Sequence, residues 1–301
     1  MRLLDALAGK NHDQPPVWLM RQAGRYLPEY RAVREKYRLE EMFFTPEIAA
    51  EITLMPVKRF GFDAAILFSD ITVVARALGL ELVFREGPVI TGRIQSFDLS
   101  PLEPIFQAMR LVKEQSPVPV IGFCGGPYTV ATYFDTVSDE LIDRLTAVSI
   151  EYVRGQIAAG ADVIQIFDSW ANQLDGEDFE KYSLQPLKKI IQSVNKPVIV
   201  FMRGSARRAE QIAELGCAIS IDSECPLADV RKRVALPLQG NLDPEILLSP
   251  DATRHATRTL LDTMGSDPAF ILNLGHGILP NTPLDSVYAL LDVVNNYSVR
   301  T

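Results

Sequence analysis

Two arginines near the start of the chain, Arg21 and Arg25, have the spacing and surroundings of a carboxylate-binding pair. Residues four apart share one face of a helix, and in a loop Gly24 would let the chain bend enough to aim both side chains inward. Two guanidinium groups placed in this way form a bidentate clamp for carboxylates. The alternative is a pair of solvated surface arginines, since most charged side chains are exposed. The aromatic and glycine-containing surroundings, from Trp18 to Tyr30, favour the clamp.

A carboxylate follows a strongly apolar segment further along the chain. Asp70 comes directly after AAILFS, which predicts a buried strand with Asp70 at its end. Such a carboxylate is either a structural hydrogen-bond acceptor or an electrostatic partner for a cationic or N–H-rich ligand. The same two interpretations apply to Asp168 and Ser169, which follow VIQIF. Tyr133, in TVATYF, is either a core residue or a ligand contact.

A histidine, His276, stands between two glycines in NLGHG, directly after the apolar run FILNL. A lone histidine is more often structural than catalytic, but the flanking glycines would let this one reach a ligand without steric hindrance. Asn241 and Asp243, in QGNLDP, are interpreted instead as loop anchors that form Asx turns.

The elements that must position these residues are short β-branched apolar runs separated by longer amphipathic segments. This pattern is typical of repeated βα units with a parallel sheet. There are eight such runs, the number of strands that closes a barrel. The runs are Val17–Met20, Ala64–Ser69, Val118–Phe123, Val163–Phe167, Val198–Met202, Ala218–Ile221, Leu236–Gln239 and Phe270–Leu274. We therefore predict an α/β fold, a (β/α)8 TIM barrel, that forms a single domain over residues 1–301.

Helical patterns fill the intervals between the runs, for example at Pro46–Phe60, Leu141–Ala159 and Pro186–Val194. The segment Leu80–Ile94 is different. Because LELVF and VITGRI flank the turn sequence REGP, it predicts a small hairpin inserted after the helix of the second strand.

Polar residues occupy the position after most of the runs. They are Arg21, Asp70, Asp168, Arg203, Asp222, Asn241 and His276. In a barrel these positions are the C-terminal strand ends, where side chains from different strands converge and where the active sites of this fold lie. The alternative is that each Asp or Asn caps the next helix, which does not account for Arg21 or His276. The sequence therefore predicts a site at that end of the barrel.

The composition is that of a globular chain with a negative net charge. It is 47% hydrophobic and 23% charged, and 30 Lys and Arg against 38 Asp and Glu give a formal charge of −8. This balance argues against a surface for nucleic acid or anionic membrane, so an anionic ligand must be bound locally. The first 38 residues, with eight basic side chains against four acidic ones, are where such a ligand could dock.

Three cysteines, an odd number in or beside apolar segments, favour a reducing cytoplasm over a secreted disulfide scaffold. The start of the chain has no apolar stretch long enough for a secretory signal, and no segment approaches the roughly 18 apolar residues of a membrane span. No His-x-Cys or Cys-x-x-Cys, Walker loop or G-x-G-x-x-G after a strand occurs. We therefore expect neither a metal nor a cofactor.

Six segments, taken in order along the chain, resemble the uroporphyrinogen decarboxylase family. They are PVWLMRQAGRYLPEYR (Pro16–Arg31), FDAAILFSDI (Phe62–Ile71), VPVIGFCGGPYTVATY (Val118–Tyr133), AGADVIQIFDSW (Ala159–Trp170), LQGNLDP (Leu238–Pro244) and NLGHGI (Asn273–Ile278). The long arginine-containing segment is highly specific, and the resemblance covers essentially the whole chain.

The resemblance implies a barrel that dimerises and removes carbon dioxide from the four acetate side chains of uroporphyrinogen III. The product would be coproporphyrinogen III, a step of haem and porphyrin biosynthesis, without cofactor or metal. The eight carboxylates of the substrate suit a basic entrance built on Arg21 and Arg25. Its four pyrrole N–H groups converge, so that one inward carboxylate, Asp70, can accept hydrogen bonds from all of them.

Carried over position by position, the resemblance makes Asp70, Arg21 and Arg25 the catalytic residues. The implied substrate-binding residues are Arg21, Gln22, Ala23, Gly24, Arg25, Asp70, Tyr133, Ser169 and His276. The implied partners are the small-molecule substrate and a second copy of the chain, with no nucleic acid and no membrane. The expected location is the cytoplasm.

The sequence departs from the family pattern at three places. The chain runs quickly from Tyr133 into the predicted helix, where the family usually has a glycine-rich turn and an extra helical segment. Ser223 follows Asp222 where we expect Trp, and Arg203 stands in MRGS where we expect a lysine, whose charge it could replace.

Two other functions compete with decarboxylation. Corrinoid methyltransferases of the same superfamily use this barrel with zinc, but thiolate ligands are missing here at the fifth and eighth strand ends. The second competitor is a non-catalytic porphyrinogen-binding homologue whose shortened loop no longer closes the site.

Overall fold

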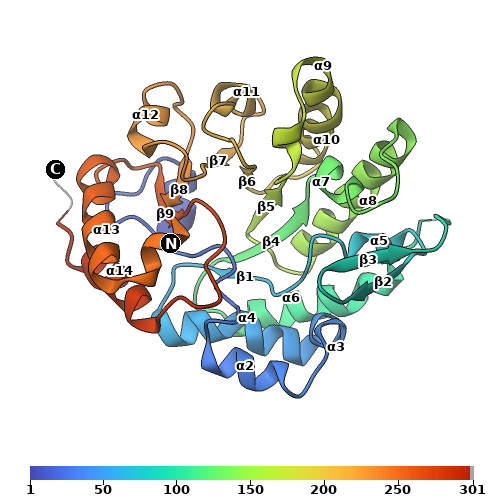
Figure 1. The fold of residues 1–301 in the computed structure, drawn as a ribbon, viewed down its shortest axis with the longest axis horizontal. Coiled ribbons are helices and arrows are strands. Elements are labelled where there is room, and N and C mark those ends of the chain that lie inside the picture. The colour runs from blue at the N-terminus through green and yellow to red at the C-terminus, as the bar shows by residue number, and fades with distance from the viewer. Residues whose placement is uncertain (96, 299–301) are drawn as a thin grey trace.

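A curled parallel sheet surrounded by helices makes up the computed structural model, which describes residues 1–95 and 97–298 (Figure 1). In this range seven strands form the sheet in the order β1-β4-β5-β6-β7-β8-β9. Their bounds are β1 Ala65–Ile66, β4 Val120–Gly125, β5 Val163–Phe167, β6 Val198–Phe201, β7 Ala218–Ser220, β8 Leu238–Leu242 and β9 Phe270–Leu274. The predicted α/β barrel class is confirmed, and seven of the eight predicted runs contribute strands.

The first predicted run, Val17–Met20, lies between β9 and β1 without forming a regular strand. Val17 makes an isolated parallel bridge to Leu272, and its carbonyl oxygen accepts a hydrogen bond from the Asp63 N–H at 2.8 Å. The N–H groups that a longer strand would use for bonds to its neighbours donate instead to side-chain oxygens. The acceptors for the N–H groups of Val17, Leu19 and Met20 are the side chains of Asp63, Gln22 and Asn273, respectively. This first run is therefore a bridging segment that completes the ring.

Helices surround the sheet, and a hairpin projects from it (Figure 1). The helices are α1 Arg2–Leu7, α2 Pro28–Arg34, α3 Leu39–Phe44, α4 Pro46–Phe60, α5 Val74–Ala77, α6 Glu103–Gln115, α7 Pro127–Ala131, α8 Asp139–Ala158, α9 Gly176–Phe179, α10 Gln185–Gln192, α11 Ala209–Ala213, α12 Leu227–Arg231, α13 Pro250–Met264 and α14 Leu284–Asn295. The predicted hairpin is confirmed as antiparallel strands β2 Glu81–Phe84 and β3 Pro88–Thr91, which lie between the short α5 and α6.

Local sequence signals account for the ends of two long helices. Helix α4 has the predicted bounds and ends at Gly61, which adopts φ +70° as a left-handed C-cap. Helix α8 begins two residues before its predicted start, because the Ser138 hydroxyl accepts a hydrogen bond from the Leu141 N–H and caps the helix at Asp139. None of the helices in the described ranges combines the length and apolarity needed to cross a membrane.

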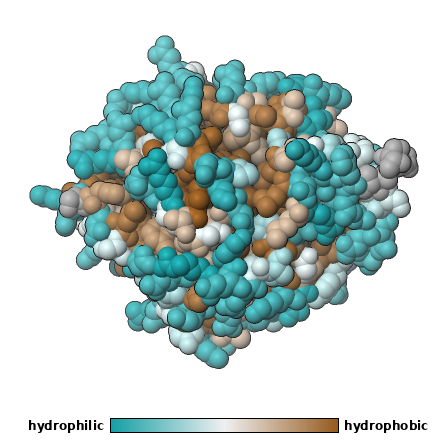
Figure 2. All heavy atoms as spheres, turned by 180° about the vertical axis from the view of Figure 1, so that it is seen from behind, coloured by the Kyte–Doolittle hydropathy of each residue, from teal (hydrophilic) through white to brown (hydrophobic). Residues whose placement is uncertain are grey.

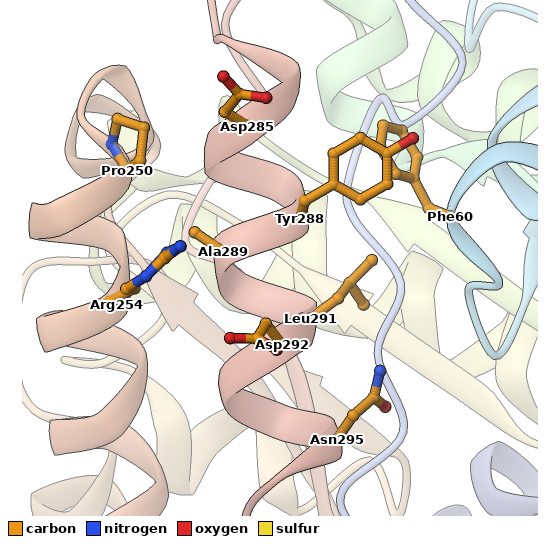
Figure 3. A pocket seen from close by; sticks show the side chains of 9 residues that line it. All are labelled: Phe60, Pro250, Arg254, Asp285, Tyr288, Ala289, Leu291, Asp292 and Asn295. Atoms are coloured by element: carbon orange, nitrogen blue, oxygen red, sulfur yellow. The ribbon is translucent and has the colours of Figure 1, made fainter.

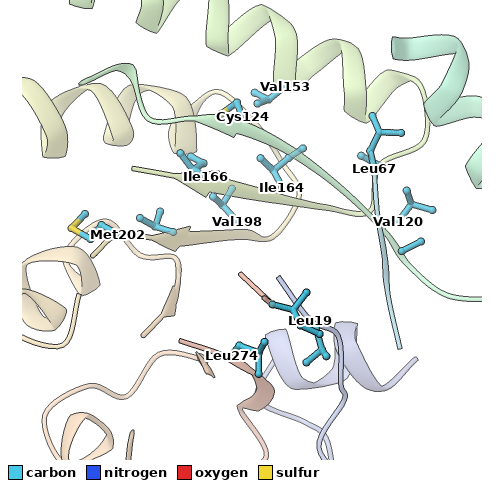
Figure 4. Packing of buried hydrophobic residues seen from close by; sticks show 14 of the residues in the cluster. Leu19, Leu67, Val120, Cys124, Val153, Ile164, Ile166, Val198, Met202 and Leu274 are labelled. Carbon is cyan, nitrogen blue, oxygen red and sulfur yellow. The ribbon is translucent and has the colours of Figure 1, made fainter. Parts of the chain in front are cut away.

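The strands separate two hydrophobic layers. Outward-facing strand residues pack against the helices, and Figure 4 shows several of them, including Cys124 of β4 with Val153 of α8. Inward-facing residues of successive strands fill the barrel, where they meet Leu3 and Ala6 of α1. Helix α1 therefore covers one end of the barrel interior, and the opposite end stays available for a site. Seen from behind, the surface is mostly hydrophilic, with hydrophobic residues near its centre (Figure 2).

A polar layer crosses the barrel interior between these apolar residues. The Trp18 indole N–H donates to Gln239 Oε1 at 2.9 Å. The Gln239 amide nitrogen donates in turn to Ser220 Oγ at 2.9 Å and to Gln165 Oε1 at 3.3 Å. Because these side chains come from different strands, their hydrogen bonds tie the barrel together from inside.

Candidate active site

A chain of aromatic contacts crosses the C-terminal ends of three neighbouring strands. The ring centroid of Phe167 lies 5.7 Å from that of Phe123 and 6.2 Å from that of Phe201, and Phe201 lies 5.9 Å from the His276 ring. Phe123 and Phe201 are buried, whereas Phe167 and His276 are partly exposed. These side chains form an apolar floor at the end of the barrel opposite α1.

Arg21 has a strained backbone at this end of the barrel. Its φ of +65° makes it the one residue other than glycine with a positive φ in the described ranges. A left-handed conformation costs a non-glycine residue about 1 kcal/mol, and such strain is typical of functional sites. The side chain is exposed, and no described residue forms an ion pair with it.

The loop around Arg21 is anchored on both sides. The Met20 N–H donates to Asn273 Oδ1 at 2.9 Å, and the Met20 carbonyl accepts from the Ile278 N–H at 2.9 Å. Gln22 is fully buried, and its amide nitrogen donates to the Ala64 carbonyl at 2.9 Å. The Gln22 side chain therefore holds the loop in place, and its backbone N–H is bonded to the Leu19 carbonyl at 2.9 Å.

Arg25 lies in the same loop as Arg21. Residues 21–27 are not helical, so the two arginines are arranged by the loop and not by a shared helix face. Arg25 is exposed, and its charge acts on Tyr30, whose pKa is raised by burial and lowered in part by Arg34 and Arg25. The intervening Ala23 and Gly24 are half-buried.

Asp70 presents one occupied and one available carboxylate oxygen. Its Oδ1 accepts hydrogen bonds from the Thr72 N–H at 2.8 Å and the Thr72 hydroxyl at 2.5 Å, whereas no described residue donates to Oδ2. Burial raises the pKa of Asp70, and the Thr72 hydrogen bonds and the charge of Arg21 offset only part of this effect. The residue is partly exposed, and its carboxyl lies deep among protein atoms, so it can meet a ligand from a poorly solvated position.

His276 lies within reach of two positive charges. Burial, followed by the charges of Arg21 and Arg203, lowers its pKa from 6.5 to about 4. The imidazole is therefore neutral at neutral pH, and it can donate or accept a hydrogen bond without carrying charge. Arg21 thus lies within electrostatic reach of both Asp70 and His276, although the three residues come from well-separated parts of the chain.

The remaining predicted contacts, Tyr133 and Ser169, are half-buried at neighbouring positions of the fold. Tyr133 lies in the turn after α7, and Ser169 follows β5. Neither hydroxyl forms a hydrogen bond with a residue in the described part of the chain, so both can bind a ligand group.

Other polar residues at the strand ends are structural. Asp168 is fully buried and accepts hydrogen bonds from the Thr129 hydroxyl at 2.7 Å and the Ser183 hydroxyl at 2.6 Å. Asp222 accepts from the Ser205 N–H at 3.0 Å, and the Asn241 amide donates to two backbone carbonyls. These residues hold connections between strands and helices, as does Asp243, which caps the turn that follows β8.

Metal ligation has little support in the described residues. No three His, Cys, Asp or Glu side chains among them come together as a possible metal site. All three cysteines are free thiols, and burial raises the pKa of Cys124 and raises that of Cys217 to about 12. A thiol of this kind is a poor source of the thiolate that zinc requires.

A groove on the outside of the barrel is separate from this site. It has a volume of about 750 Å³ and lies along α13 and α14, where it includes none of the predicted site residues (Figure 3). Its lining residues are Phe60, Pro250, Arg254, Asp285, Tyr288, Ala289, Leu291, Asp292 and Asn295.

Sequence reasoning missed Gly277, Trp170 and the three phenylalanines of the floor as parts of the site. A Cβ at Gly277 would lie 2.5 Å from Arg21 Cδ, and Trp170 carries the guanidinium of Arg203 over its ring at 4.4 Å from the centroid. The floor could have been found from the alternation of the strands, because the runs 118–123, 163–167 and 198–202 each carry a phenylalanine at or near their end.

The sequence matches a known protein family. A model of the uroporphyrinogen decarboxylase family matches residues 1–136 and 134–297. A uroporphyrinogen decarboxylase of Protochlamydia amoebophila is 40% identical and aligns with 97% of this chain and 91% of its own length. One from Thermus thermophilus is 37% identical and aligns with 97% of this chain and 96% of its own.

Two solved structures have a similar fold. A methyltransferase from Methanosarcina mazei superposes with a TM-score of 0.81 and 26% identity, covering 98% of this chain and 97% of its own. A B12-independent methionine synthase from a Shewanella species, at 14% identity and a TM-score of 0.63, shares the fold.

Fold and site together define a TIM-barrel-like protein with an arginine-rich mouth over an apolar floor. The chain belongs to the uroporphyrinogen decarboxylase family. The two matched stretches meet at residues 134–136, directly after Tyr133, where the sequence departs from the family pattern. The alignment with the Protochlamydia protein spans 330 residues, more than the 301 of this chain, so that relative has internal segments that this chain lacks. Only seven residues separate α7 from α8.

Proposed function

We propose that this protein decarboxylates the four acetate side chains of uroporphyrinogen III to give coproporphyrinogen III. The single observation that carries the proposal is Asp70, which offers an available carboxylate oxygen within reach of the charge of Arg21 in a poorly solvated mouth. The membership of the chain in the uroporphyrinogen decarboxylase family supports the same substrate.

The cations of the mouth bind the anionic rim of the substrate in this proposal. Arg21 and Arg25 meet side-chain carboxylates, and each guanidinium can donate two parallel hydrogen bonds to one carboxylate. Tyr133, Ser169 and the neutral His276 contact further acetate or propionate oxygens. The apolar floor packs against the carbon skeleton and excludes water from the reacting ring.

Asp70 acts on the centre of the substrate. The pyrrole N–H groups converge, and the available Oδ2 of Asp70 accepts hydrogen bonds from them. When a ring carbon beside an acetate-bearing position takes up a proton, the ring becomes cationic, and the fixed anion stabilises that charge without reorganising. Because the environment is poorly solvated, this electrostatic effect is larger than it would be in water.

The ring itself supplies the electron sink for decarboxylation. The bond between the acetate carboxylate and its methylene carbon breaks, and its electron pair passes into the cationic ring as carbon dioxide leaves. A proton then adds to the exocyclic carbon to form the methyl group, and the proton taken up by the ring carbon is lost. Arg21 is placed to orient the carboxylate that leaves, although an arginine is too weak an acid to supply the proton.

Two finer properties belong to the same proposal. The protein works in the cytoplasm, which suits its three free thiols, and it forms a homodimer. Light scattering of the purified protein over a range of concentrations tests the dimer, and a monomer at every concentration would contradict it.

An anaerobic incubation with uroporphyrinogen III tests the reaction. After oxidation, the porphyrins are separated by their number of carboxylates. Stepwise conversion to the four-carboxylate product is the expected result, and it would show that the short connection after Tyr133 permits every step. Unchanged substrate would contradict the proposal. Zinc-dependent methyl transfer or binding without turnover would then be tested by elemental analysis and by porphyrin binding.

A further inference from the structure

Arg203 is a half-buried cation at the end of β6 without a carboxylate partner among the described residues. The arginines that follow it in the same loop are paired: Arg207 lies 3.0 Å from Glu224, and Arg208 lies 2.8 Å from Asp175. Partial burial of an unpaired charge is unfavourable unless an anion approaches it. Arg203 therefore differs from its neighbours in having its charge available for a ligand.

Trp170 holds this guanidinium in one place. The Arg203 Cζ lies 4.4 Å from the centre of the Trp170 ring, within the range of a cation–π interaction. The backbone N–H of Trp170 donates to the Thr129 hydroxyl at 2.9 Å, and that hydroxyl donates to the buried Asp168 at 2.7 Å. A guanidinium stacked on an indole keeps its edge N–H donors free for a planar anion, so the group is positioned before a ligand binds.

The strand order places Arg203 across the barrel from Arg21. Arg21 follows the bridging segment 17–20, which lies between β9 and β1. From that segment β6 is four positions away in either direction around the ring. The charges of both arginines nevertheless act on His276, so the two side chains approach the same space from opposite sides.

We propose that Arg203 binds a side-chain carboxylate of the substrate on the wall opposite Arg21 and so determines specificity for molecules with carboxylates around their whole rim. This inference rests on the proposed function and names a further binding residue for the same site. A macrocycle held at two opposite points of its rim stays centred over Asp70. Trp170 is the positioning residue, since it acts through Arg203.

Steady-state kinetics with uroporphyrinogen test the inference in the full-length protein. Loss of a charge-assisted hydrogen bond weakens binding by about 10-fold or more, so Arg203→Gln should raise KM by that factor. The value of kcat should change little, because Arg203 is placed to hold the rim and not the reacting ring. The KM of Arg203→Lys should lie between those of Arg203→Gln and the wild type, since lysine keeps the charge and lacks the planar guanidinium. Trp170→Leu should raise KM in the same direction.

Arg207→Gln is the matched control, because it removes a guanidinium from the same loop that is paired with Glu224. It should leave KM unchanged. If Arg203→Gln has the same KM and kcat as Arg207→Gln, the inference is overturned while the proposed function stands. If Arg203→Gln does not fold, Arg203→Lys decides by the same comparison.

Equilibrium binding of uroporphyrin, the oxidised octacarboxylate that is not turned over, separates this inference from the proposed function. Quenching of porphyrin fluorescence reports its affinity without any reaction. A weaker affinity in Arg203→Gln than in Arg207→Gln supports the carboxylate contact even if the wild type fails to decarboxylate. Equal affinities in the two variants would contradict it.

Discussion

The side chain of Arg21 crosses the α-carbon of Gly277 so closely that a β-carbon added there would lie 2.5 Å from Arg21 Cδ. The two residues are far apart in sequence and adjacent in space, because the bridging segment 17–20 lies next to β9. The glycine after His276 thus leaves room for an arginine side chain, a purpose that the isolated motif NLGHG does not reveal. The backbone after β9 therefore determines where the Arg21 side chain can lie.

Gly277→Ala should displace Arg21 and leave the fold intact. The added methyl group would meet flexible side-chain atoms of Arg21, which can move aside, whereas the strand and helix contacts are unchanged. A shift of about 1 Å in a positioning group can lower the rate by about 100-fold, so we expect kcat/KM to fall by about 10- to 100-fold. Gly87→Ala, in the hairpin turn where an added methyl group meets nothing, is the control. Equal activity of the two variants would contradict this role of Gly277.

Asp70→Asn should abolish turnover, with a loss of about 100-fold or more, because the amide cannot stabilise a cationic ring electrostatically. The Asn side-chain oxygen can still accept both hydrogen bonds from Thr72, so the local structure should persist. Discontinuous assay of the porphyrin products measures the effect. Near-wild-type activity would remove Asp70 from the mechanism.

The same variant should be more stable than the wild type at neutral pH. Burial raises the folded-state pKa of Asp70 above its ordinary 3.8, so the ionised carboxylate destabilises the folded protein at pH 7. That unfavourable contribution disappears as the pH falls through the raised pKa toward 3.8, and the advantage of Asp70→Asn should shrink with it. Thermal denaturation at several pH values measures the difference.

Asp98 provides the matched control for this stability effect. It binds Ser100 as Asp70 binds Thr72, but it is exposed, and the Ser100 hydrogen bonds lower its pKa. Asp98→Asn should therefore lower the stability at pH 7 slightly. A stability gain in both variants would show that removing negative charge, and not burial of Asp70, is the cause.

His276 should make the folded protein less stable in acid. Its folded-state pKa of about 4 lies below the ordinary 6.5, so between these values the unfolded chain binds more protons than the folded chain. Its contribution is complete above pH 6.5 and is lost as the pH falls toward 4. His276→Asn should show a smaller loss of stability over this window in urea denaturation. His255→Asn, on α13, is the control for the loss of an imidazole. If the stability of the wild type and of His276→Asn changes with pH in parallel, the pKa shift is contradicted.

Asp168→Ala should destabilise the fold. The change removes the acceptor for the hydroxyls of Thr129 and Ser183, which would remain buried without partners. We expect a loss of about 3 kcal/mol or more in the free energy of unfolding. Asp135→Ala, at an exposed position, is the control in chemical denaturation. A loss of activity without a loss of stability would instead assign Asp168 to catalysis.

The repeated apolar runs predicted the barrel class because strand and helix periodicities are local properties of the chain. Local periodicity did not reveal that Val17–Met20 forms no regular strand. Its N–H groups are taken by side chains as distant as Asn273, so a run with good strand propensity became a bridging segment. The predicted Asx turn is confirmed at Asp243, which accepts a hydrogen bond from the Glu245 N–H. Asn241 lies in β8 and forms no Asx turn, because its amide donates to the carbonyls of Asp222 and Cys225.

The sequence by itself determined the barrel class, the family and the placement of Arg21, Asp70 and His276 after apolar runs, because each of these depends on residue type and order. Only the tertiary structure decided that Gln22 and Asp168 hold the scaffold, that Asp70 keeps one oxygen available, and that Arg203 lies stacked on Trp170. The physical reason is that burial, hydrogen-bond partners and the field of nearby charges come from residues brought together by folding. These surroundings determine whether a polar group supports the fold or meets a ligand.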